Sequence, residues 1–125
     1  MKNSQKFYQT GTKYYQNAIF LSKSNQQPSL IAYNLISMSA EFLMSAILYK
    51  NGIEPYKTEK DIVEALIKNS LIPEKIKTKA IELKKQCDYK ETSSATQTHH
   101  IGGLCTALQD IKTWVDTQLK PVRCI

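Results

Sequence analysis

The segment at residues 29–49 constrains the fold most, because it is the most apolar part of the chain and far longer than an ordinary strand. Its polar residues Asn34, Ser37, Glu41 and Ser45 follow one another at steps of three, four and four, which places them on one helical face. A stripe that holds a carboxylate and an amide predicts an amphipathic core helix. A lipid-facing helix would leave that charge unpaired, so we expect no membrane association.

Prolines and glycines divide the rest of the chain into windows of helical length, and strict apolar–polar alternation over a strand length is missing. The expected helices span residues 5–24, 29–51, 59–69, 73–88 and 99–119. Short connectors favour antiparallel neighbours. The sequence therefore predicts an all-α, up-and-down bundle of four to five helices.

Two helix ends carry recognisable signals. Gly52 is expected to take the left-handed position after the second helix, with Ile53 folding back onto its last turn. Thr58 is expected to cap the third helix, with Asp61 at the third helical position.

The length of 125 residues supports a single domain, residues 1–125, with its core at roughly 5–120. The formal charge is +6, from 17 Lys and Arg against 11 Asp and Glu, and the only arginine is Arg123. Chemistry that needs an internal guanidinium is thereby excluded.

The three cysteines Cys87, Cys105 and Cys124 form no closely spaced pair, and residues 1–9 lack the apolar stretch of a signal peptide. These features predict reduced thiols, a cytoplasmic location and no metal site. No motif of the sequence implies a cofactor.

The pair His99–His100 is the first candidate for chemistry. Adjacent helical residues point about 100° apart, so the pair does not match the i, i+4 spacing of metal ligands. At the start of a helix one histidine could act as an acid or base or bind an anion. The alternative is that both are partly exposed capping residues.

Glu41 and the lysines of the fourth helix are further candidates. Glu41 is either a site acid or part of a polar stripe that is satisfied inside the bundle or at a subunit interface. Lys84, Lys85 and Lys90 either bind phosphate or nucleic acid, or belong to a solvated face.

Residues 39–55, SAEFLMSAILYKNGIEP, resemble the second helix of HEPN domains, the higher-eukaryote and prokaryote nucleotide-binding domains. Residues 58–66 are similar to the family's Thr-His-Asp-Leu segment, with one extra residue and without its histidine. The resemblance implies a helical bundle that is commonly dimeric. Many family members are metal-independent ribonucleases in which four to six residues separate an Arg from a following His. Others are noncatalytic partners of nucleotidyltransferases or bind nucleotides.

The chain departs from the ribonuclease motif. Counted back from His100 or His99, the arginine position falls within residues 92–95, none of which carries a positive charge. We therefore expect a noncatalytic binding or partner module, associated with nucleotides or RNA, beside a nucleotidyltransferase or in a toxin–antitoxin or defence locus. The alternative is a divergent ribonuclease that uses His99 or His100 with Lys90.

Self-association is expected as well. The helix at residues 29–51 offers apolar side chains over most of its circumference, more than one small bundle can cover. This pattern predicts a homodimer.

The purified protein is expected not to cleave RNA. Metal-free cleavage through a 2′-hydroxyl needs a base, an acid and a fixed cation, and the cation is missing at the family's spacing. The assay incubates the metal-free protein with structured and single-stranded RNA, beside a His99→Ala, His100→Ala double variant. Cleavage by the parent that disappears in the double variant would contradict the prediction and support the ribonuclease alternative.

Overall fold

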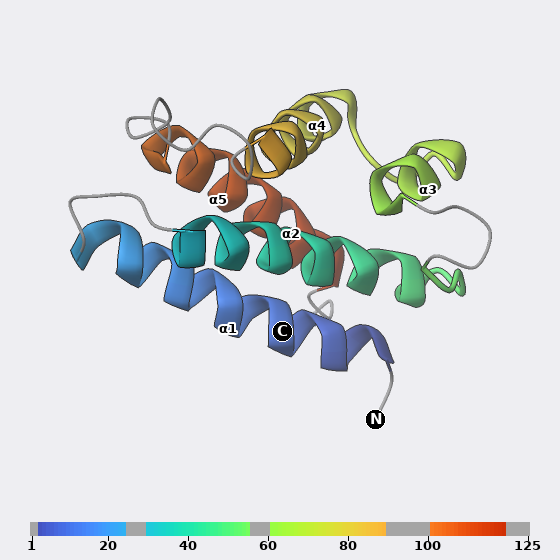
Figure 1. Ribbon diagram of the computed structural model, residues 1–125. Coiled ribbons are helices and arrows are strands. Elements are labelled where there is room, and N and C mark those ends of the chain that lie inside the picture. Colours follow the sequence, from blue (N-terminus) through green and yellow to red (C-terminus); the bar gives the residue numbers. More distant parts are fainter. Residues whose placement is uncertain (1–2, 25–29, 56–60, 90–100, 120–125) are drawn as a thin grey trace.

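The computed structural model describes residues 3–24, 30–55, 61–89 and 101–119 (Figure 1). Within these ranges the chain forms five α-helices and no strand, which confirms the all-α prediction and the helical bundle. The helices are α1 (Asn3–Ser24), α2 (Leu30–Lys50), α3 (Ile62–Lys68), α4 (Glu74–Tyr89) and α5 (Ile101–Leu119).

The helices are arranged around α2. α1 and α2 lie side by side and run in opposite directions, and α5 packs against the pair from one side (Figure 1). α4 packs against α5, and the short α3 lies near the C-terminal half of α2. α2 therefore has neighbours on most of its circumference, but not on all of it.

The core is built mainly from α2 and α5. Side chains that are at most 2% exposed come from both helices, namely Tyr33, Ile36, Leu43, Ile47, Leu48, Leu108, Ile111 and Val115. α4 adds Ile76, Ala80 and Leu83, which recur at helical spacing and are buried too. By length and composition alone, Ile31–Lys50 could cross a membrane. In this structure 61% of the segment is buried in the bundle, as is typical of a core helix.

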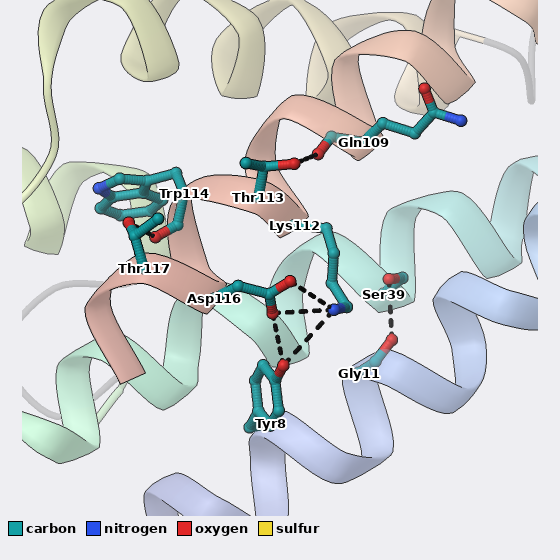
Figure 2. Close-up of polar contacts among 9 residues, drawn as sticks. All are labelled: Tyr8, Gly11, Ser39, Gln109, Lys112, Thr113, Trp114, Asp116 and Thr117. Atoms are coloured by element: carbon teal, nitrogen blue, oxygen red, sulfur yellow. Dashed lines mark hydrogen bonds and ion pairs between the residues drawn. The ribbon is translucent and has the colours of Figure 1, made fainter. Parts of the chain in front are cut away.

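A close approach of two backbones joins α1 to α2. A Cβ at Gly11 would lie 2.9 Å from Cγ of Leu43 and 3.0 Å from the Leu43 backbone nitrogen, so no larger residue fits without movement. The buried hydroxyl of Ser39 donates a hydrogen bond of 2.9 Å to the Gly11 carbonyl oxygen (Figure 2). Two small residues thus allow the helices to touch along their backbones.

The end of α2 follows the prediction. Gly52 has φ of +77°, the Ile53 N–H donates to the Leu48 carbonyl at 2.9 Å, and the Gly52 N–H donates to the Tyr49 carbonyl at 3.0 Å. These two bonds define a Schellman motif, and the half-buried Ile53 packs against the core.

The start of α3 corrects the prediction. Asp61 is the N-cap, not the third helical residue, because its carboxylate accepts a hydrogen bond of 2.8 Å from the Val63 N–H. The same carboxylate lies 3.4 Å from the Lys84 ammonium of α4. The expected cap Thr58 lies outside the described residues.

The end of α3 repeats the Schellman pattern without glycine. Ser70 adopts φ of +57°, and the Leu71 N–H donates to the Leu66 carbonyl at 2.9 Å. A left-handed conformation costs a residue with a Cβ about 1–2 kcal/mol.

Ser70→Gly is therefore expected to stabilise the protein by about 0.5–1 kcal/mol, because glycine adopts the left-handed conformation without strain. Gly52→Ser, which introduces that strain at the equivalent position of α2, should destabilise it by about 1 kcal/mol. Urea unfolding followed by circular dichroism measures both. A Ser70→Gly variant less stable than the parent would contradict this account.

Candidate functional site

The histidines and the last lysine proposed for chemistry, His99, His100 and Lys90, lie outside the described residues. Their catalytic or phosphate-binding roles therefore stay predictions. The expected start of the last helix at residue 99 lies outside as well, and the described part of α5 begins at Ile101.

The two other candidate lysines are on α4. Lys84 and Lys85 are both exposed, and the Lys84 ammonium forms the ion pair with Asp61. A phosphate at Lys84 would therefore compete with a carboxylate of the protein itself. Binding of nucleic acid by these lysines stays a prediction.

The polar stripe of α2 is divided between two environments. Asn34 and Glu41 are exposed and Ser37 is half-buried, whereas Ser45 is only 3% exposed. The hypothesis that the bundle interior satisfies Glu41 is wrong, because Glu41 is exposed at the edge of a hollow that it shares with α3 and α4. The other hypothesis, that Glu41 lies at a subunit interface, stays open.

A small hollow lies between α2, α3 and α4. Its volume is about 50 Å³, with Ser37, Glu41, Asp61 and Lys84 as its polar lining. Its apolar lining consists of Ala40, Met44, Ile62, Val63, Ala80 and Leu83. Pockets for drug-sized ligands have volumes of about 300–1,000 Å³, so this hollow is too small for a nucleotide.

A polar cluster that sequence reasoning missed joins α1 to α5 (Figure 2). The Tyr8 hydroxyl of α1 donates a hydrogen bond to the Asp116 carboxylate of α5. The Lys112 ammonium donates to both Asp116 oxygens, at 2.8 and 2.9 Å, and lies 3.4 Å from the Tyr8 oxygen. It also lies 5.3 and 5.6 Å from the ring centroids of Tyr8 and Tyr15, within the range of cation–π attraction.

Burial and hydrogen bonding shift the proton equilibria of this cluster. Burial, followed by the hydrogen bond to Asp116, raises the pKa of the Tyr8 hydroxyl above 10.0. Burial alone would lower the pKa of the Lys112 ammonium, whose side chain is 14% exposed. The hydrogen bond and the charge of Asp116 outweigh that effect, so the pKa of Lys112 is raised above 10.5.

These shifts indicate a structural role. A general base or nucleophile at neutral pH needs a pKa close to or below 7, whereas both groups are held more firmly in their protonated forms. Each of the three polar groups also has the other two as partners. The cluster therefore clamps α1 to α5.

An apolar surface lies on the side of the α1–α2 pair away from α5. We call it the outer face and define it by Ile31, Met38, Phe42 and Tyr49 of α2 with Phe7 and Tyr14 of α1. The ring centroid of Phe7 lies 5.3 Å from the ring centroid of Phe42 and 4.9 Å from that of Tyr49. The ring centroids of Tyr14 and Phe42 are 5.5 Å apart. All four rings are half-buried, whereas Ile31 is 64% and Met38 39% exposed.

The direction of the outer face follows from the helix period. Phe7 and Tyr14 precede Tyr8 and Tyr15, which lie beside Lys112 of α5. Neighbouring residues point about 100° apart on a helix, so the first pair is turned away from α5. The four α2 residues recur at steps of seven, four and seven, which keeps them on one face.

Metal binding and similarity to known proteins add no further site. Among the residues that the structure describes, no group of three or more His, Cys, Asp or Glu side chains could hold a metal ion. No family model, curated protein or solved structure matches this chain significantly. The HEPN resemblance therefore rests on the sequence segments alone.

Tyr8→Phe is expected to destabilise the protein by about 1–2 kcal/mol at pH 7, because it removes a hydrogen bond to a charged group. The folded-state pKa values of Tyr8 and Lys112 are raised, so their contribution is complete below pH 10 and is lost as the pH rises above it. The difference between parent and variant should therefore be constant up to about pH 10 and shrink above it.

Urea unfolding across this pH range measures the difference. Tyr15→Phe is the matched control, since it keeps a ring beside Lys112 and should change stability less. A Tyr8→Phe effect that grows as the pH rises would contradict the assigned direction of the pKa shifts.

Proposed function

We propose that this protein is a noncatalytic interaction module that binds a protein partner through the outer face. The observation that carries the proposal is the exposure of Ile31 and Met38 beside four half-buried aromatic rings. Scattered exposed apolar residues are ordinary, but apolar residues that recur along one exposed face of a core helix are typical of a contact surface.

The chemistry of the outer face supports a protein partner. Its six defining residues carry no charge, and aromatic and methionine side chains are enriched where proteins meet. Tyr14 and Tyr49 add hydroxyl groups that could bond to a partner backbone. A nucleic acid, by contrast, would require cations on the binding face itself.

The HEPN resemblance suggests the setting in which this module acts, and it leaves the occupant of the outer face open. Noncatalytic members of that family act beside nucleotidyltransferases, and an equivalent role in the cytoplasm, in a toxin–antitoxin or defence locus, is part of this proposal. The net charge of +6 supports a secondary, weak and salt-sensitive association with RNA or nucleotides.

Photo-crosslinking in the native host tests the outer face as a docking surface. A benzophenone amino acid replaces Met38 in one variant and Glu64, an exposed residue of α3, in the control. Irradiation is expected to join a protein to position 38, which mass spectrometry identifies, and to give no equivalent product at position 64. Equal yields at the two positions, or none at either, would contradict the proposed function.

A further inference from the structure

We propose that the outer face binds a second copy of this chain, in a two-fold dimer that places Lys13 of each protomer beside Glu41 of its partner. The inference rests on the proposed function, because it names the occupant of the same docking face. It also gives Glu41 the interface position left open above.

The apolar part of the outer face can pair with itself. In a two-fold dimer the same patch serves on both protomers, so the patch must be self-complementary. Ile31, Met38, Phe42 and Tyr49 form an uncharged stripe along α2, and the half-buried Leu35 lies beside it. Two such stripes in contact bury apolar surface on both protomers without burying a charge.

The two charged residues border this stripe on opposite sides. Lys13 precedes Tyr14, and Tyr15 on the other side of Tyr14 lies beside Lys112 of α5. Lys13 is therefore on the part of α1 turned away from α5. Glu41 precedes Phe42, and Leu43 on the other side of Phe42 packs on Gly11 of α1, so Glu41 is turned away from α1.

Both charges are available for a partner. Lys13 and Glu41 are exposed, and neither forms an ion pair with another described residue. Lys13 and Glu41 directly precede Tyr14 and Phe42, whose ring centroids are 5.5 Å apart. The two charged residues therefore lie at the same level along the helix pair.

Symmetry brings the two charges together. We consider a two-fold axis that runs along the outer face, parallel to α2. Rotation about it keeps the position of each residue along α2 and places the α1 side of the partner opposite the Glu41 side of the first protomer. The α1 helix of the partner then lies on the side of α2 that carries Glu41. Lys13 of one protomer and Glu41 of the partner subunit meet at one level, and the same contact occurs twice.

Charge reversal tests this arrangement by light scattering and sedimentation at protein concentrations up to about 100 µM. Glu41→Lys and Lys13→Glu each convert two attractions into two repulsions, so each is expected to weaken self-association about tenfold or more. A 1:1 mixture of the two variants should form a heterodimer as stable as the parent dimer, since both contacts in it are again attractive. Glu64→Lys, on α3, is the control that should leave association unchanged.

The outcomes separate the dimer from the docking function. Restored association in the mixture also proves that both variants are folded, and it supports the proposed contact. A parent that stays monomeric at 100 µM, or a dimer insensitive to both reversals, overturns the proposal. If position 38 then crosslinks to a different protein, the outer face still docks a partner, but that partner is not a second copy.

Discussion

The backbone contact between Gly11 and Leu43 is the constraint on which the rest of the structure depends. This contact fixes which side of α1 faces α2. The neighbouring faces of α1 are thereby directed to different surfaces of the helix pair. Phe7 and Tyr14 meet the α2 rings on the outer face, while Tyr8 and Tyr15 lie beside Lys112 of α5. One small residue thus sets both the clamp and the proposed docking surface.

The helices and their seams could be predicted because their signals are local. The 3.6-residue period of apolar side chains identified the buried faces of α2, α4 and α5, and Gly52 marked the end of α2 through a conformation that glycine adopts most easily. Asp61 was misplaced because Thr58 and Asp61 are both good caps. Lys84, which comes from another helix, pairs with Asp61, and no local pattern contains that contact.

The polar contacts of the site depend on tertiary structure, which the sequence does not display. The spacing of Lys112 and Asp116 suits an ion pair on one helix, but their third partner is Tyr8, 108 positions before Asp116. The apolar helix around Glu41 suggested a core position, yet its side chain is exposed at the edge of the hollow between α2, α3 and α4. The roles of His99 and His100 stay predictions, since both lie outside the described residues.

The clamp between Tyr8 and Asp116 also bears on how the protein is made. Ribosomes deliver α1 and α2 well before α5, and the contact between α1 and α2 is complete without it. The surface of the α1–α2 pair that packs against α5 therefore stays exposed to water until α5 has left the ribosomal exit tunnel. During synthesis the nascent chain therefore exposes two apolar surfaces, of which the clamp closes only one.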